Sequence, residues 1–134
     1  MGLDMYASAA PLNERVKDEV QVDFTEDELG LELSGTKQLW YWRKHHDLHG
    51  WMHRLYTEKG GVDPDFNMNT VRLMHKDLDR LQEDVELNKL PKTTGFFFGN
   101  YPPDDESKAE DLKFIEEARR CLDKGMIVWY HSWW

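Results

Sequence analysis

Histidines are concentrated in one short stretch of the sequence. His45, His49 and His53 follow one another at four-residue intervals. In a helix this spacing places imidazoles on one face, where a pair of them can bind a divalent metal ion. The motif of the zinc proteases needs a glutamate directly after its first histidine, whereas Gly50 follows His49 here. Metal binding and a purely structural role both stay open. We favour the structural role, in which the histidines form hydrogen bonds within a partly buried helix face.

A metal site would need a further ligand from elsewhere in the chain. The candidates are His75, Asp4 and the acidic pair at 104–105. Their positions in the sequence do not rank them, so His49 and His53 are only weak metal candidates. We expect no cofactor, and a metal-dependent hydrolase is the least favoured of the functions considered below.

A run of three phenylalanines forms a second unusual feature. It lies between Gly95 and Gly99 and predicts a short buried strand bracketed by turns. The alternative is an aromatic wall beside a ligand pocket, where glycines allow a close approach of the backbone. A small, nucleotide-like ligand would then be bound by side chains near this wall. The candidate ligand-binding residues are Arg43, His49, Asn100 and Tyr101.

Familiar catalytic motifs are missing from the sequence. It contains neither a phosphate-binding glycine loop nor the glycine-flanked serine of a nucleophile elbow. Residues 63–69 resemble the start of a calcium loop, but Met68 and Met74 replace its required glycine and carboxylate. The single cysteine, Cys121, has no catalytic signature around it. The sequence identifies no catalytic residue, leaves enzymatic activity open and favours a binding role.

Charge and composition limit the classes of partner. The chain has 26 acidic and 17 basic residues and a net charge of −9. Direct binding of nucleic acid is not expected, because attraction to phosphate needs a basic surface. No apolar run approaches the ~20 residues that span a bilayer, so no membrane association is expected. A lone cysteine suits a reducing compartment, and the start of the sequence lacks the pattern of a signal peptide. We therefore expect a cytoplasmic protein.

Periodicity along the chain predicts an α+β fold. Residues 3–7 and 126–134 favour strands. Apolar residues at helical spacing predict helices over about 37–58, 70–87 and 107–124, with Trp51 on the core face of the first. We expect residues 1–134 to form a single domain, in which three helices pack on a small, mostly antiparallel sheet. The two ends of the chain are expected to supply strands to that sheet.

Several short segments carry a resemblance. Taken together, they resemble a family of small, acidic, uncharacterised proteins of bacteriophages and bacterial prophages. The matching segments are Met1-Gly-Leu-Asp-Met-Tyr6, Tyr41-Trp-Arg-Lys44 with His49 and Trp51, Leu90-Pro91, Gly95-Phe-Phe-Phe-Gly99, Asp111-Leu112 and Tyr130-His-Ser-Trp133. The chain departs from the family pattern at His45-His46, where that pattern has Ala-Asn, and at Pro102-Pro103. The resemblance implies a phage-type accessory protein in the cytoplasm of a host cell, and it implies no particular activity.

Three functions follow as expectations. The first is binding of a host or defence protein, with inhibition as the effect. The second is binding of a small, nucleotide-like ligand in a pocket. The third is metal-dependent hydrolysis at the histidines.

Overall fold

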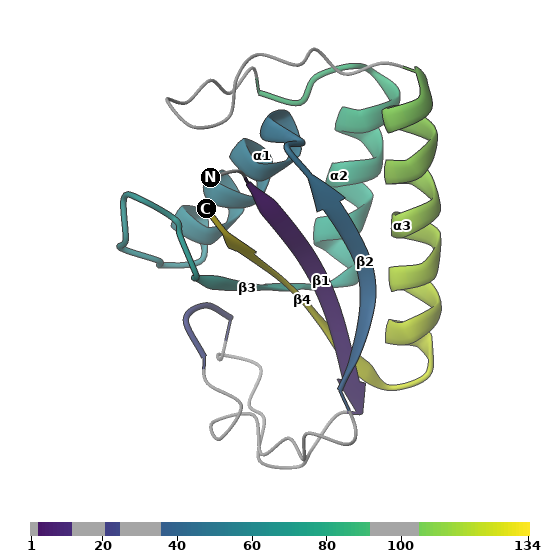
Figure 1. Ribbon diagram of the computed structural model, residues 1–134. Helices are drawn as coiled ribbons and strands as arrows, with labels where there is room; N and C mark the ends of the chain where they lie inside the picture. The colour runs from purple at the N-terminus through teal and green to yellow at the C-terminus, as the bar shows by residue number, and fades with distance from the viewer. Residues whose placement is uncertain (1–2, 12–20, 25–35, 92–104) are drawn as a thin grey trace.

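The computed structural model describes residues 3–11, 21–24, 36–91 and 105–134. Within these residues the chain forms strands and helices that alternate irregularly (Figure 1). The elements are β1 (Asp4–Pro11), β2 (Lys37–Arg43), α1 (His46–Glu58), β3 (Thr70–Leu73), α2 (His75–Glu86), α3 (Asp105–Asp123) and β4 (Met126–Trp133). The predicted α+β class is confirmed, with three helices on a small antiparallel sheet among the described residues.

The sheet has the strand order β2-β1-β4-β3, and each neighbouring pair is antiparallel. The first and last strands of the chain lie at its centre. They pair along their whole length, from Asp4 opposite Trp133 to Pro11 opposite Met126. The prediction that both ends of the chain supply strands is therefore confirmed.

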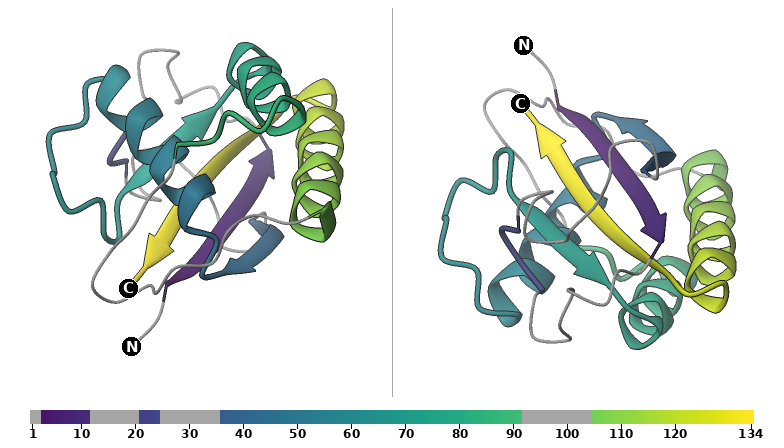
Figure 2. Two further views of the ribbon diagram at one scale, coloured as in Figure 1. Left: turned by 90° about the horizontal axis from the view of Figure 1, so that it is seen from above. Right: turned by 90° about the horizontal axis from the view of Figure 1, so that it is seen from below.

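The helices form a layer behind the strands in Figure 1, and α2 and α3 lie side by side in every view (Figures 1 and 2). The main core fills the space between this layer and the sheet. Trp51 of α1 lies in that core with 5% of its surface exposed, as predicted. Its Nε1 donates a hydrogen bond to Asp84 Oδ2 of α2 at 2.8 Å, so the same side chain fills the core and ties two helices together.

The first predicted helix begins later than expected. Residues 37–43 form the strand β2, and α1 begins at His46. Between them Lys44 has a φ of 57°, a left-handed conformation through which an α-helix cannot continue. The aromatic run from Trp40 to Trp42 favours a strand, and β1 offers it a pairing edge. Helical spacing alone did not reveal that competing partner.

The second predicted helix also begins with a strand. Val71 and Leu73 are buried, and β3 pairs with residues 128–131 in the middle of β4. Met74 is extended, with φ −115° and ψ 169°, so α2 starts at His75 rather than at residue 70. The Asp77 side chain accepts a hydrogen bond from the backbone N–H of Met74 at 2.9 Å, which stabilises the first turn. The predicted helix over 70–87 is thus wrong over its first five residues.

Residues 105–134 follow the prediction closely. The third helix spans Asp105–Asp123 where 107–124 was expected, and β4 follows at Met126. Gly125 has a φ of 78°, the left-handed conformation that ends a helix without the steric cost of a Cβ. The helix thus begins two residues earlier than predicted. The predicted strand at residues 96–98 lies outside the described residues.

Candidate functional site: the open face of the sheet

The alternation of side chains along each strand gives the sheet two different faces. Met5, Ala7 and Ala9 of β1 point into the core beneath the helices. Their neighbours Asp4 and Tyr6 must point to the opposite face, because successive strand residues alternate. No helix among the described residues covers that opposite, open face.

Strand register brings six side chains together on the open face. One cross-strand row consists of Trp133, Asp4 and Arg43. The next row consists of His131, Tyr6 and Tyr41. Residues directly opposite each other in antiparallel strands point to the same side, with Cβ atoms about 5 Å apart. We call this group the aromatic face, and its members are Asp4, Tyr6, Tyr41, Arg43, His131 and Trp133.

Direct contacts hold the aromatic face together. The Tyr6 ring stacks on His131 with the centroids 5.1 Å apart, and its other neighbour is the Tyr41 ring at 5.3 Å. The Tyr41 hydroxyl donates a hydrogen bond to Asp4 Oδ1 at 2.6 Å, and Arg43 Nε lies 4.0 Å from the same oxygen. The face is therefore organised before any partner binds.

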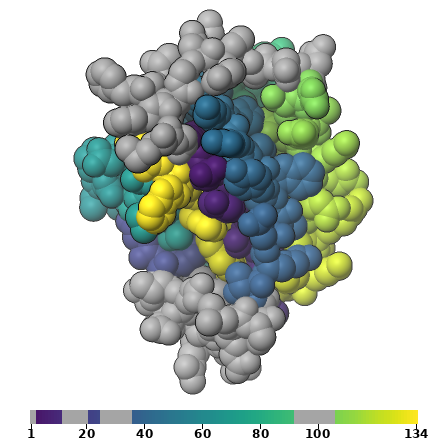
Figure 3. All heavy atoms as spheres, viewed as in Figure 1, coloured from purple at the N-terminus to yellow at the C-terminus, as the bar shows by residue number. Residues whose placement is uncertain are grey.

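Exposure differs between the two ends of the open face. At one end Ala10, Phe24, Ile127 and Trp129 form a small buried cluster. At the other end 45% of Tyr41 and 59% of Trp133 are exposed. Figure 3 shows atoms of the first and last strands, in purple and yellow, at the surface beside those of β2 in blue. Large aromatic side chains are costly to leave in water, so their gathering at one end marks a candidate contact surface.

Two groups of the aromatic face have shifted proton affinities. The hydrogen bond to Asp4 raises the pKa of Tyr41 above 10, because it stabilises the protonated phenol beside a carboxylate. Burial lowers the pKa of His131 below 6.5, which favours the neutral imidazole at neutral pH. His131 Nε2 lies 3.4 Å from the Ser8 hydroxyl, at the limit of a hydrogen bond. The face thus presents Arg43 as its one positive charge at neutral pH.

The predicted ligand-binding residues are not all on one face. Arg43 belongs to the aromatic face. His49 lies on the covered face, where its Nδ1 is 2.7 Å from the Tyr130 hydroxyl, and both side chains are buried. Asn100 and Tyr101 are outside the described residues, so a ligand site that includes them stays a prediction.

The three evenly spaced histidines have different surroundings. His45 precedes α1, and its Nε2 lies 2.7 Å from the buried carboxylate of Asp111. His49 is buried, which lowers its pKa to about 3, with smaller contributions from the neighbouring His53 and His46. His53 stacks on the Phe66 ring at 5.0 Å. In the part of the chain that the structure describes, no three His, Cys, Asp or Glu side chains are grouped to hold a metal ion.

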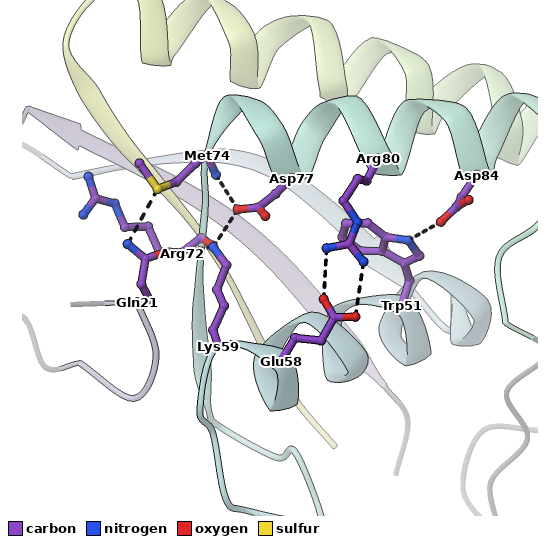
Figure 4. A network of polar contacts seen from close by, with 9 residues as sticks. All are labelled: Gln21, Trp51, Glu58, Lys59, Arg72, Met74, Asp77, Arg80 and Asp84. Carbon is purple, nitrogen blue, oxygen red and sulfur yellow. Dashed lines mark hydrogen bonds and ion pairs between the residues drawn. The ribbon is translucent and has the colours of Figure 1, made fainter. Parts of the chain in front are cut away.

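A second polar cluster is buried where α1, β3 and α2 meet (Figure 4). The Lys59 ammonium donates to Gln21 Oε1 at 2.9 Å, to the backbone carbonyl of Arg72 at 2.6 Å and to Asp77 Oδ2 at 2.6 Å. Burial lowers the pKa of Lys59, while the contacts with Asp77 oppose that shift. An ammonium has three protons to donate, and three acceptors surround this one. The cluster is therefore a structural tie between elements.

Sequence analysis missed most of the aromatic face. It assigned Tyr41 to a helix face and gave no role to Tyr6, His131 or Trp133. The available signal was the alternation in the first and last strands, read together with their antiparallel pairing. All six members of the aromatic face come from three of the segments that carry the phage-protein resemblance, namely residues 1–6, 41–44 and 130–133.

Comparison with known proteins does not assign this chain to a family. No protein-family model, curated protein or solved structure matches the chain. None of the helices in the described ranges is long and apolar enough to cross a membrane.

Proposed function

We propose that this chain is a small, acidic accessory protein of bacteriophage type that acts by binding another protein through its aromatic face. The observation that carries the proposal is the exposed end of that face, where Tyr41 and Trp133 are 45% and 59% exposed beside Arg43. Tyrosine, tryptophan and arginine are the residue types enriched in the centres of protein interfaces.

The organisation of the face supports binding over a random exposure of aromatic rings. Tyr6 is stacked on His131, and Tyr41 is hydrogen-bonded to Asp4, so these side chains lose little freedom when a partner covers them. The rings also stand on three paired strands, which hold them more rigidly than a loop would.

The class of partner comes from the resemblance and the charge. A phage-type accessory protein acts in the cytoplasm of the host, where its partner is a host protein or a defence protein that it inhibits. The net charge of −9 keeps the protein soluble and disfavours nucleic acid as the bound molecule.

Affinity capture from a bacterial lysate tests the proposal with three baits. They are the wild type, a face variant with Tyr41→Ser and Trp133→Ser, and a control variant with Val62→Ser and Leu87→Ser. The control residues are 89% and 53% exposed and lie outside the aromatic face. We expect a stoichiometric partner with the wild type and the control, and capture weakened by about tenfold or more with the face variant. Failure to capture a partner at micromolar concentration, or equal capture by all baits, would contradict the proposal.

A small planar ligand is the second candidate occupant of the same face. It is favoured by the position of Arg43 in the row beside Tyr41, a pairing of charge and ring that suits an anionic, nucleotide-like molecule. A thermal-shift screen against nucleotides and metabolites tests it. A ligand at one hundred times its dissociation constant stabilises the folded state by about 2.7 kcal/mol. A screen in which no compound raises the melting temperature would rule out this candidate, and the proposal of protein binding would be unaffected.

A further inference from the structure

The two edges of the sheet are finished differently. At the β3 edge, the segment 21–24 continues the hydrogen bonding of the sheet. The Asp23 N–H donates to the Thr70 carbonyl at 3.0 Å, the Arg72 N–H donates to the Gln21 carbonyl at 2.8 Å, and Val22 forms a bridge with Val71. That edge is closed by the chain itself.

Among the residues that the structure describes, nothing comparable covers the β2 edge. Among the described residues, none makes a backbone hydrogen bond to β2 from the side away from β1. Alternate residues of an edge strand direct their N–H and carbonyl groups outward, where they can pair with another strand. Such an edge is the structural requirement for β-strand addition by a partner.

The charge of β2 contrasts with that of the whole chain. Its seven residues, Lys37-Gln-Leu-Trp-Tyr-Trp-Arg43, contain two cations and no anion, although the chain carries a net charge of −9. Both cations are exposed and lie at opposite ends of the strand. A strand with carboxylates near its ends would therefore complement β2, and a second copy of this acidic chain would be repelled.

The side chains between these cations offer contact area. Tyr41 is exposed and Leu39 and Trp40 are half-buried. Leu39 is an extra residue in the pairing with β1, because Trp40 lies opposite Ala7 and Gln38 opposite Ser8. A bulge of this kind reverses the alternation, so the two end cations point to different faces of the sheet. A complementary strand needs an acid on each of its own faces.

We propose that the outer edge of β2 binds an extended strand of the partner protein that carries acidic side chains toward both of its ends. The inference rests on the proposed function, since it names how that partner is held. The added strand would extend the sheet to five strands and bring the partner alongside Tyr41 and Arg43 of the aromatic face.

A synthetic peptide tests the edge without any captured protein. The probe has seven alternating valine and threonine residues, the length of β2, with two glutamates at each end. The matched control carries lysines in place of the glutamates. Hydrogen exchange of the β2 amides is measured on the full chain with either peptide. At about ten times the dissociation constant, we expect the glutamate peptide to slow the exchange about tenfold. The lysine peptide, which the net charge of the chain favours, should leave it unchanged.

Charge-reversal variants provide a second test in the same hydrogen-exchange experiment. The variant Lys37→Glu with Arg43→Glu should lose protection by the glutamate peptide and gain it from the lysine peptide. The variant Lys76→Glu with Lys124→Glu makes the same change in net charge at exposed sites outside β2 and should behave as the wild type does. No protection by the glutamate peptide, or equal effects of both peptides, would overturn the inference. The lysate capture described above can succeed or fail independently of this result.

Discussion

The covered and open faces of the sheet use the same kinds of side chain in opposite ways. On the covered face Asp111 is buried and accepts hydrogen bonds from Trp42 Nε1 at 3.2 Å and from His45 Nε2 at 2.7 Å. On the open face Asp4 accepts a bond from Tyr41, which is exposed. The first arrangement satisfies polar groups that packing has removed from water. The second leaves aromatic rings exposed, so the position of a side chain in the sheet, and not its residue type, decides whether it is buried or accessible.

Truncating one tryptophan on each side gives the largest expected contrast. Trp51 fills the core and is 5% exposed, so Trp51→Ala should lower the free energy of unfolding by about 3–5 kcal/mol, the usual penalty for a lost buried ring. Trp133, which is 59% exposed, should cost less than about 1 kcal/mol when changed to alanine. Urea unfolding measures both variants.

The same two variants also test whether the two faces differ in this way. A loss below about 1 kcal/mol for Trp51→Ala would show that the α1 face bearing Trp51 is not a core. A loss as large for Trp133→Ala as for Trp51→Ala would make the open face part of the folded core and remove its claim to be a contact surface.

Burial of His49 predicts a pH-dependent stability. Its pKa is lowered from 6.5 to about 3, chiefly by burial. Between these values the unfolded chain binds a proton that the folded chain does not, so stability falls as the pH decreases through this window. The contribution is about 1.4 kcal/mol per pH unit at its steepest, or about 1.6 kcal/mol between pH 6.5 and 5. At pH 6.5 the slope is half of its maximum, because half of the unfolded chains carry the proton, and it vanishes about one pH unit higher.

Two variants isolate this effect in urea unfolding at a series of pH values. His49→Phe removes the titrating group, so the slope of stability against pH should be smaller than in the wild type by that amount. Tyr130→Phe removes the hydrogen-bond partner of His49 but keeps the ring that buries it, and it should retain the slope. Equal slopes in the wild type and in His49→Phe would show that His49 is protonated in the folded state and would reopen its candidacy as a functional group.

Much of the fold could be predicted because several segments have one dominant preference. The helix α3 is amphipathic, and it ends at Asp123, two residues before the left-handed Gly125. The aromatic and β-branched residues of β4 favour a strand in nearly any setting. The segments at β2 and β3 were misassigned because their apolar spacing also fits a helix, and pairing with β1 and β4 decided the outcome.

The candidate site was harder to predict, because it depends on strand register. Tyr6, Tyr41 and His131 are far apart in the sequence and meet only through two antiparallel pairings. The sequence drew attention instead to the regular spacing of His45, His49 and His53. That spacing places residues on one helix face only where a helix exists, and His45 precedes α1.

The smallest expected effect concerns the hydrogen bond between Tyr41 and Asp4 on the open face. This bond and the nearby carboxylate raise the pKa of Tyr41 above 10. Asp4→Asn removes the negative charge, so the phenol should ionise at lower pH, closer to its ordinary value. Near-ultraviolet absorbance during a titration measures the change, and Tyr41→Phe identifies the amplitude that belongs to this residue. If Asp4→Asn leaves that amplitude at the same pH, the two side chains are not coupled in solution. The aromatic face would then be less organised than its contacts indicate, and its rings would have to be ordered by the partner.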